Sequence, residues 1–516
     1  MNTDSRTYNS ARNLIMSIIQ KVVSILLTFV GRQIFLRVLT VEYLGINGLF
    51  VNIISMLSLA DLGLATAMSF SFYKPLADKN EEKLAALVGF YRKIYNYIAA
   101  FVAVAGLALT PFLKYIINLE SDIPYIEVYY LIALANTVVS YLFVYKATVI
   151  TADQNSSIVT KYYVWTSILV MLLQIAILLT TGSFMAFSLA TIIGTLGNNL
   201  LISGKAKRMY PFIQRKVPLE AGDRKDILNN IKSMFIYKIS NVVYKGTDNI
   251  FISAIISTAI VGKYENYRLA VTNLSMFAFM IFTSLTPSIG NMIAKERPGK
   301  HMRVFTMMQT VSYWLGGFFV FCLFFLLDDF VVLWLGAGFV FDSSTKTAIL
   351  LHFYLSIALY PIIAFREATG MYQKTKYAMV AAAVLKIALS IVMGIYFGLA
   401  GIVFATTISK LLTYAWYEPK ILFRDHLDGK ASGYLAGHVI NLVMLCACIA
   451  FTYFVFPWKE SAGWLEWLLR GFACTIAINA VYLLRYFRSP ELKDIAGKIF
   501  GLLKKISKNN KTPLGQ

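Results

Sequence analysis

The sequence is poor in the residues that usually bind metal ions. Its 516 residues include only four cysteines and four histidines. All four cysteines lie inside apolar stretches, where a cysteine usually acts as a small buried hydrophobic residue. Cys446 and Cys448 are two residues apart and would point away from each other on a helix. The histidines show no ligand spacing, so we expect no metal site.

A glycine-rich phosphate-binding loop of the GxxxxGK[ST] type is also missing. The sequence therefore gives no indication of a built-in ATPase, and we expect no cofactor. A cleavable signal peptide is not visible either. The first apolar run, residues 13–39, carries Lys21, Arg32 and Arg37 and lacks a small-residue cleavage site. We expect this run to be the first membrane-spanning helix.

Apolar residues, by contrast, are abundant. Hydrophobic residues make up 58% of the chain, and the mean hydropathy is +0.63. A soluble protein is roughly 45–50% apolar. Runs of about 20 apolar residues recur along the chain, and each is long enough to cross about 30 Å of hydrocarbon. Because they lack strict alternation, they predict helices rather than barrel strands, and hence an all-α polytopic membrane protein.

The apolar runs predict about fourteen transmembrane helices. Gly182-Ser183 divides the fifth from the sixth, and the stretch 397–401 divides the eleventh from the twelfth. Pro287, Pro361 and Gly316-Gly317 lie within spans and predict bends. The predicted spans are 13–38, 44–72, 91–113, 124–149, 160–182, 184–203, 231–257, 263–293, 303–327, 346–370, 377–397, 398–418, 434–456 and 463–486.

Basic residues predict the orientation. If the N-terminus is cytoplasmic, 35 of the 48 Lys and Arg residues fall in cytoplasmic flanks and loops, and four fall outside. The four outer residues are Lys114, Lys263, Lys346 and Lys459. This asymmetry predicts a multi-pass membrane protein with both termini in the cytoplasm. It also accounts for most of the net charge of +21, which we attribute to topology and anionic lipid rather than to nucleic-acid binding.

The lengths of the predicted loops help to distinguish a transporter from an enzyme. The longest predicted cytoplasmic connection, 204–230, is short and basic, and the largest outer loop is about 328–345. Neither has room for a soluble catalytic domain, so the sequence favours a transporter over an enzyme. A membrane glycosyltransferase or polymerase remains an alternative, and its acid/base residues would have to come from Glu120, Asp122, Asp328 and Asp329.

An internal repeat is indicated by one matched spacing. Lys21 precedes Gly45 by 24 residues, and Lys238 precedes Gly262 by 24 residues. The repeat predicts an N-lobe of helices one to six and a C-lobe of helices seven to twelve, in parallel orientation. The predicted boundaries are 1–203 for the N-lobe, 204–230 for a basic linker, 231–418 for the C-lobe, 434–486 for two added helices and 487–516 for a basic tail.

Cationic stripes lie on the first helix of each predicted lobe. On one helix, Lys21 and Arg32 share a face with serines and a threonine; on the other, Lys238, Asn241 and Lys245 recur at steps of three and four. Charges inside a membrane normally face the bundle interior or a watery cavity. With Arg268 on the eighth helix, they predict a cationic cavity that binds substrate. Snorkelling or ion pairing is the alternative for these residues.

Other charged residues are also predicted to lie inside the membrane. Asp61 and Asp248 are predicted to lie at depth, either as partners of these cations or as a switchable coupling pair. Lys386 and Lys410 lie in the middle of the eleventh and twelfth spans and are further candidates for the cavity. Arg366 and Glu367 predict an interfacial pair at the end of the tenth span. A cavity rich in Lys and Arg suits an anion with several oxygens, such as a diphosphate.

Two stretches carry a resemblance to a known family. One begins Glu42-Tyr43-Leu44-Gly45-Ile46-Asn47-Gly48-Leu49-Phe50 and continues through Leu59-Ala60-Asp61-Leu62-Gly63-Leu64 to Tyr73-Lys74-Pro75-Leu76-Ala77. The other joins Thr247-Asp248-Asn249-Ile250-Phe251-Ile252-Ser253 to Val261-Gly262-Lys263-Tyr264. Both resemble the Wzx-like branch of the multidrug/oligosaccharidyl-lipid/polysaccharide (MOP) flippase superfamily.

The resemblance implies two six-helix lobes in a V shape and transport by alternating access. It implies a flippase of the bacterial inner (cytoplasmic) membrane, which moves undecaprenyl-diphosphate-linked oligosaccharide from the cytoplasmic to the outer leaflet. Relatives of the lipid II flippase type place essential cations on helices one, two and eight; here helix two offers only Asp61, and Lys238 and Lys245 are expected to take that place. Membrane lipids, a polysaccharide polymerase and glycosyltransferases are implied partners. A cation-coupled multidrug exporter of the same fold is the alternative within the superfamily.

Overall fold

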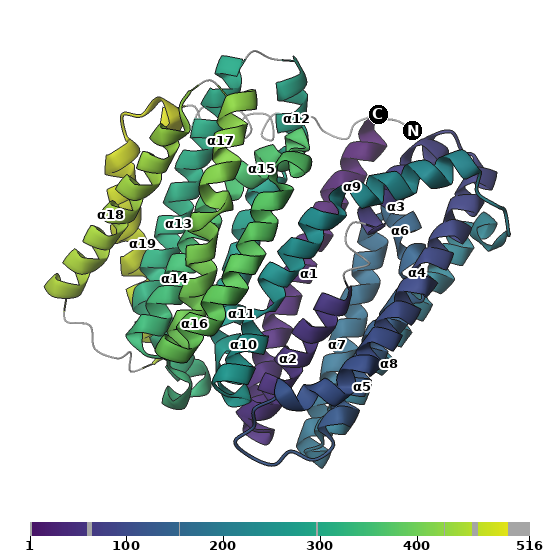
Figure 1. The fold of residues 1–516 in the computed structure, drawn as a ribbon, viewed down its shortest axis with the longest axis horizontal. Coiled ribbons are helices and arrows are strands. Elements are labelled where there is room, and N and C mark those ends of the chain that lie inside the picture. The colour runs from purple at the N-terminus through teal and green to yellow at the C-terminus, as the bar shows by residue number, and fades with distance from the viewer. Residues whose placement is uncertain are drawn as a thin grey trace, which may run out of the picture. The chain divides into compact units, whose positions relative to one another are not determined.

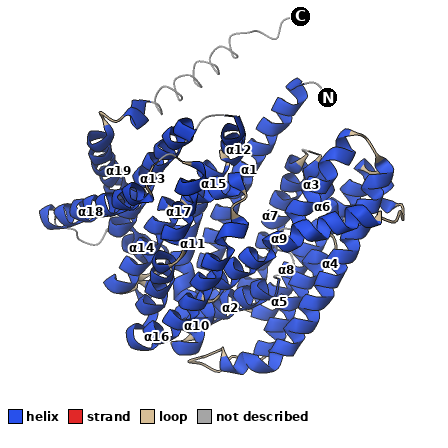
Figure 2. Cartoon of the chain, turned by 45° about the horizontal axis from the view of Figure 1, so that its top comes forward, coloured by secondary structure: helices blue, strands red, loops and turns tan. Residues whose placement is uncertain are grey.

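The computed structural model of the chain describes residues 3–58, 64–153, 155–295, 298–427, 429–456 and 463–493. Over these residues the chain is almost entirely helical and contains no β-strand (Figure 2). Long helices follow one another through short loops (Figure 1). The structure therefore confirms the predicted class, an all-α polytopic membrane protein.

Two compact units make up the chain. The first contains Met1–Glu265 and Ser390–Gly398, and the second contains Asn266–Leu389 and Leu399–Gln516. Helices α11 and α16 therefore contribute residues to both units. The predicted lobe boundary at 204–230 lies inside the first unit, and the two-lobe repeat itself stays a prediction.

The first unit is built mainly from the N-terminal helices. Its elements are α1 (Thr3–Val38), α2 (Val41–Leu57), α3 (Leu64–Ala77), α4 (Glu81–Leu109), the 3₁₀ helix η2 (Thr110–Tyr115), α5 (Ile126–Tyr141), α6 (Val144–Ala152), α7 (Ser156–Thr181), α8 (Phe184–Met209), η3 (Pro211–Gln214), α9 (Ala221–Gly246), α10 (Asp248–Ile255) and the first turns of α11 (Thr258–Thr283).

The second unit begins within α11. Its other elements are α12 (Thr286–Lys295), α13 (Pro298–Leu335), η4 (Ala337–Phe339), α14 (Ser343–Ala358), α15 (Tyr360–Thr369), most of α16 (Tyr372–Leu412), α17 (Tyr414–His426), α18 (Ala431–Val455) and α19 (Trp464–Tyr486).

Length and hydropathy identify ten helical segments of the described residues as able to cross a membrane, or eleven if the bent pair α5–α6 counts as one span. The two predicted spans at 44–72 and 231–257 are not among them. The helix α2 is apolar but has only 17 residues, and α9 has a polar composition with several lysines. These two segments account for part of the difference from the predicted fourteen.

One of the ten segments holds two predicted spans. It runs from Tyr372 to His426 and has 55 residues. At 1.5 Å per residue, a helix of this length is more than about twice as long as one crossing of the hydrocarbon core requires. Within α16, Gly398 has φ 58° and ψ −139°, which interrupts the helical backbone. Only glycine adopts this conformation without strain. The predicted division between the eleventh and twelfth spans at 397–401 is confirmed.

The turn between α7 and α8 is equally well defined. Gly182 ends α7 in the left-handed conformation, with φ 60°. Ser183 then begins α8, and its hydroxyl accepts a hydrogen bond from the Ala186 backbone N–H at 3.3 Å. A left-handed glycine after a helix and a serine N-cap before one are the usual signals for such a junction. The predicted division at Gly182-Ser183 is therefore confirmed.

Large apolar side chains face outward as well as inward. Tyr91, Tyr95 and Tyr130 are fully enclosed in the core of the first unit, whereas Val104 on α4 and Leu169 on α7 are 68% and 63% exposed. A water-soluble protein rarely leaves broad apolar surfaces uncovered, but hydrocarbon covers them in a bilayer. Exposed apolar faces on the same helices that form the core are thus what a membrane-embedded bundle requires.

Candidate functional site

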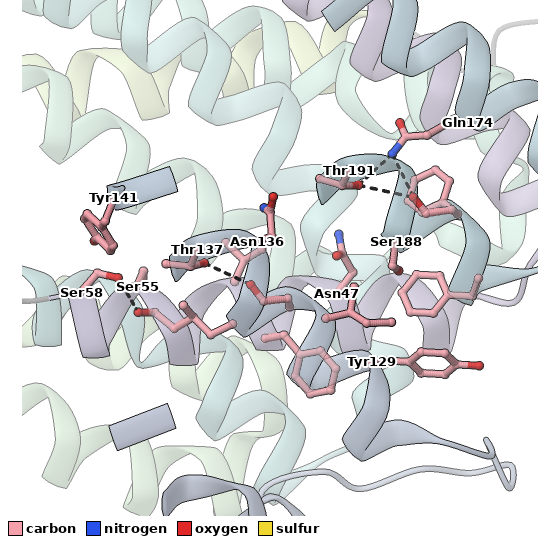
Figure 3. A pocket seen from close by; sticks show the side chains of 17 residues that line it. Asn47, Ser55, Ser58, Tyr129, Asn136, Thr137, Tyr141, Gln174, Ser188 and Thr191 are labelled. Carbon is pink, nitrogen blue, oxygen red and sulfur yellow. Dashed lines mark hydrogen bonds between the residues drawn. The ribbon is translucent and has the colours of Figure 1, made fainter. Parts of the chain in front are cut away.

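A cavity of about 720 Å³ lies inside the first unit. Four helices line it, namely α2, α5, α7 and α8 (Figure 3). Its size falls within the range of about 300–1,000 Å³ that small-molecule sites usually have. The lining residues are Asn47, Phe50, Val51, Ile54, Ser55, Ser58, Tyr129, Ile132, Ala133, Asn136, Thr137, Tyr141, Gln174, Phe184, Phe187, Ser188 and Thr191.

Helical periodicity explains why these residues meet. On α2 the lining positions begin at Asn47 and recur at steps of three or four residues as far as Ser58. On α5 they run in the same way from Tyr129 to Tyr141, and on α8 from Phe184 to Thr191. Residues three and four apart lie on one face of a helix. The helices α2, α5 and α8 therefore each turn one continuous face toward the cavity, and α7 adds Gln174.

Uncharged hydrogen-bonding groups form one part of the lining (Figure 3). The Gln174 amide on α7 donates to the Thr191 hydroxyl on α8 at 3.0 Å, which fixes its orientation. The Ser55 and Thr137 hydroxyls donate to backbone carbonyls of their own helices, so their oxygens can still accept a hydrogen bond. The Asn136 Oδ1 atom is buried and has no partner among the described residues. The cavity thus presents amides and hydroxyls to a ligand.

Aromatic rings form the other part of the lining. Phe184 packs edge-to-face against Tyr129, with 4.9 Å between ring centroids, and lies parallel to Phe187 at 6.2 Å. Phe35 of α1 supports both phenylalanines from behind, at 6.0 and 5.2 Å. Mutually packed rings lose little freedom when a ligand contacts them. This wall is therefore a rigid apolar surface beside the polar groups.

None of the described residues that line this cavity is charged. None of the predicted cationic residues is among them. Lys21 and Arg32 lie half-buried on α1, and Lys245 lies exposed near the end of α9. Asn241 and Asp248 are half-buried on α9 and α10. The structure therefore places these five side chains in the first unit but outside the cavity, and a shared cationic chamber stays a prediction.

The remaining predicted cations belong to the second unit. Arg268 is half-buried on α11, while Lys386 and Lys410 are 0% and 4% exposed on α16. The Lys410 ammonium donates to the Ser356 hydroxyl on α14 at 2.8 Å. A buried lysine is costly in a membrane interior, so both positions remain candidates for a functional role. Asp61 and the side chain of Lys238 lie outside the described residues.

The sequence did not indicate the neutral cavity or buried carboxylates such as that of Glu265. Glu265 on α11 is 8% exposed, and its carboxylate accepts a hydrogen bond from the Asn249 amide at 2.6 Å. The available signals were isolated polar residues within apolar spans, such as Gln174 and the Ser188–Thr191 pair. Such residues are common, and only their convergence in space marks them as a site.

The structure of this chain is similar to solved structures of other proteins, although its sequence gives no match. No protein-family model matches the chain, and no curated protein matches its sequence. The structure is similar to that of lipid II flippase MurJ in an inward closed conformation, at 13% identity over 92% of this chain and 99% of that chain, with a TM-score of 0.64.

Two further similar structures are transporters. The multidrug transporter DinF-BH of the MATE type, solved with R6G, is 16% identical over 82% of this chain and 96% of that one, with a TM-score of 0.58. A MOP superfamily transporter from Pyrococcus furiosus, described as having a binding pocket of reverse polarity, is 12% identical over 81% and 96%, with a TM-score of 0.56. At these identities the likeness shows the fold, and the chain has the fold of the MOP superfamily transporters.

Proposed function

We propose that the chain is a flippase that moves a lipid-linked oligosaccharide, carried on undecaprenyl diphosphate, from the cytoplasmic to the outer leaflet. The observation that carries the proposal is the uncharged cavity of the first unit, in a chain with the fold of MOP transporters. In this proposal the protein makes and breaks no covalent bond. It binds the head group, changes conformation and releases the head group on the other side.

The lining of the cavity suits a sugar. A sugar ring has hydroxyls around its edge, which both donate and accept hydrogen bonds, and C–H groups on its faces. Amides such as those of Asn47, Asn136 and Gln174 match the edge, because each carries both a donor and an acceptor. Packed aromatic rings such as Tyr129 and Phe184 offer flat apolar surfaces to a ring face. A few directed polar groups within a largely apolar wall are typical of specific small-molecule sites.

The diphosphate would be bound elsewhere in the protein. We assign it to the cationic residues predicted from the sequence, of which Lys21 and Arg32 lie half-buried on α1 in the first unit. Arginine binds phosphate oxygens through two parallel hydrogen bonds, and lysine acts as a mobile point charge. Arg268, Lys245 and Lys238 complete the proposed set, with Asn241, Lys386 and Lys410 as further members. Asp61 and Asp248 are the proposed coupling carboxylates.

A multidrug exporter is the second candidate, because the aromatic part of the lining also suits a flat organic compound. The two functions differ in what the polar part of the cavity must do. A sugar needs directed hydrogen bonds, so loss of the Gln174 amide should weaken its binding; an apolar drug should tolerate an apolar replacement. Gln174→Leu therefore separates the candidates.

The test begins with a deletion strain. If the proposal holds, lipid-linked oligosaccharide accumulates on the cytoplasmic side of the membrane, and a surface glycan is lost. The intact gene restores export, whereas we expect Gln174→Leu to lower export about tenfold, as the loss of a directed hydrogen bond in a binding site does. Arg32→Ala, Lys245→Ala and Arg268→Ala test the proposed phosphate residues in the same assay.

Thr180→Val provides the matched control. Thr180 is exposed on α7, the helix that carries Gln174, and its hydroxyl donates to carbonyls of its own helix. This variant should export normally. Unchanged export of every surface glycan in the deletion strain would rule out the flippase, and drug sensitivity in its place would favour the exporter.

Location and partners complete the proposal. The charge distribution predicts an inner-membrane protein with both termini in the cytoplasm. Because the sequence shows no nucleotide-binding loop, an ion gradient or the membrane potential is the proposed source of energy. A polysaccharide polymerase on the outer side and glycosyltransferases on the inner side are the proposed partners, since they would consume and supply the substrate.

A further inference from the structure

Three basic side chains from three different helices come together within the first unit. Arg92 lies on α4, Lys146 on α6 and Lys207 on α8, and α6 packs against both of the other helices (Figure 1). Both Lys207 and Arg92 lie close enough to Lys146 to repel its ammonium group. We call these three residues the inner cationic cluster. Because like charges repel, an anion bound among them would make the arrangement more favourable.

The central member of the cluster, Lys146, is held in place by its neighbours. Its side chain is half-buried, and its ammonium group donates to the Ser203 hydroxyl on α8 at 2.6 Å. The same group lies over the rings of Phe143 and Tyr145, at 5.3 and 5.6 Å from their centroids. A lysine ammonium has three donors, so two of them can bond to oxygens of a ligand.

Acidic residues at the ends of the same helices bond elsewhere. Asp153 follows α6 and accepts a hydrogen bond from the Tyr210 hydroxyl at 2.7 Å. Glu81 begins α4 and pairs with Arg215 at 3.2 Å. Neither carboxylate therefore serves as the counter-ion of the cluster, and an anion from outside the protein can take that place.

The cluster lies at one level of the predicted membrane. The sequence places the inner ends of the three spans at residues 91, 149 and 203, and each basic residue of the cluster lies within four residues of one of these ends. The headgroups of the cytoplasmic leaflet lie at this level, and its anionic lipids attract basic residues. The predicted topology therefore brings the cluster next to phospholipid headgroups.

Apolar side chains continue from the cluster toward the outer side. Tyr97 on α4 is 74% exposed, and Leu200 on α8 is 52% exposed. Leu200 and Lys207 are seven residues apart and share one face of α8. Between them a Cβ atom built on Gly204 would meet nothing within 4 Å, so this part of the face is open. A cationic end and an open apolar surface match the two parts of an anionic phospholipid.

We infer that the inner cationic cluster binds the headgroup of an anionic phospholipid of the cytoplasmic leaflet. The Lys146 ammonium contacts the phosphate, with Arg92 and Lys207 on either side, and the acyl chains lie along the exposed apolar side chains of α4 and α8. Arginine suits phosphate oxygens through paired hydrogen bonds, and lysine adds a mobile charge. The three residues are not among those that line the neutral cavity. The lipid is thus a ligand separate from the proposed cargo, and the inference does not depend on the proposed function.

Native mass spectrometry of the purified chain tests the site. The chain in detergent is titrated with phosphatidylglycerol or with phosphatidylcholine of the same acyl chains, and the dissociation constant of the first bound lipid is measured. The first lipid carries a net negative charge, whereas the second is neutral overall. We expect phosphatidylglycerol to bind at least about tenfold more tightly.

Neutral replacements locate the site. Lys146→Gln, Arg92→Gln and Lys207→Gln should each weaken phosphatidylglycerol binding about fivefold, the usual effect of one basic residue near a membrane surface, and leave phosphatidylcholine binding unchanged. Lys161→Gln is the matched control, because it removes the same charge from an exposed residue near the start of α7 in the same unit. It should bind both lipids like the parent. Arg92 and Lys207 are exposed, so these two variants decide the question if the half-buried Lys146 is needed for folding.

A further variant tests the apolar part of the site. Gly204→Leu fills the open position on α8 and should weaken phosphatidylglycerol binding severalfold. Inorganic phosphate alone should compete poorly, because it makes no apolar contact. Displacement of phosphatidylglycerol by an equal concentration of inorganic phosphate would show a site for a free anion and would overturn the inference.

Two other results would also overturn it. Equal binding of the two phospholipids, or equal weakening by Lys161→Gln, would show that the cluster is not a specific site. Tighter binding of undecaprenyl phosphate than of phosphatidylglycerol would assign the cluster to the proposed substrate instead. The titrations involve no transport step, so failure of the chain to export a glycan would contradict the proposed function and leave the lipid site standing.

Discussion

The ion pair between Arg366 on α15 and Glu418 on α17 is almost completely enclosed in the second unit. Their side chains are 7% and 2% exposed, and the guanidinium reaches both carboxylate oxygens at 2.9 and 3.0 Å. The Tyr372 ring lies over the guanidinium at 5.6 Å. The sequence predicted Glu367 as the partner of Arg366, because it is adjacent. The structure shows Glu418 as a partner, 52 residues away in the chain, and the pairing with Glu367 stays a prediction.

Removal of one charge from this pair should destabilise the protein strongly. Glu418→Ala removes a carboxylate that lies against a buried guanidinium, and breaking a buried ion pair in this way typically costs about 3–5 kcal/mol. The measurement is the midpoint of thermal unfolding in detergent. Glu81→Ala serves as the control, because Glu81 and its partner Arg215 are 55% and 61% exposed. An exposed pair contributes about 1 kcal/mol or less. Equal unfolding midpoints for the two variants would therefore contradict the prediction that the buried Arg366–Glu418 pair stabilises the protein strongly.

At the scale of single helices, the sequence predicted some breaks well. The α14–α15 and α11–α12 junctions lie just before Pro361 and Pro287, where proline removes a backbone donor and the preceding turn cannot continue. At Gly316-Gly317 α13 runs on without a break from Pro298 to Leu335, and the predicted bend there stays a prediction. Gly317 instead allows α19 to approach: an added Cβ atom would lie 1.9 Å from the Tyr482 hydroxyl oxygen.

The break in α16 requires a glycine at position 398, and a substitution there tests this requirement. Gly398→Ala places a side chain at φ 58° and ψ −139°, a region that is nearly restricted to glycine, and should cost about 1–3 kcal/mol. A lower midpoint of thermal unfolding is expected. Gly204→Ala is the matched control, because Gly204 lies within α8 with nothing within 4 Å of its added Cβ atom. Alanine favours helix, so this control should be neutral or slightly stabilising.

At the scale of the whole molecule, the charge asymmetry predicts which loops are accessible from each side. Lys216→Cys lies in the exposed basic connection after α8, and Asp122→Cys lies in the exposed loop before α5. An impermeant maleimide added to intact cells should label Asp122→Cys and leave Lys216→Cys unmodified. Permeabilised cells, in which both should label, provide the control. Labelling of Lys216→Cys in intact cells would reverse the predicted orientation.

Composition and periodicity predicted the class of fold and several helix boundaries, because these depend on local chemistry. The neutral cavity could not be predicted in this way. Asn47, Asn136, Gln174 and Thr191 belong to four different helices, and nothing within any one helix indicates that they converge. The cationic stripes were visible because their periodicity lies within single helices. Whether the stripes share a chamber depends on packing over long range, and that part of the site stays a prediction.

The uncharged lining of the cavity has a consequence for how binding should respond to ionic strength. Salt screens attraction between charges but leaves hydrogen bonds and ring contacts nearly unaffected. The free oligosaccharide, which has no phosphate, should therefore bind almost equally well in dilute and concentrated buffer. Its diphosphate-linked form should lose affinity as salt is added. The difference between the two titrations would report separately on the sugar-binding and phosphate-binding parts of one transporter.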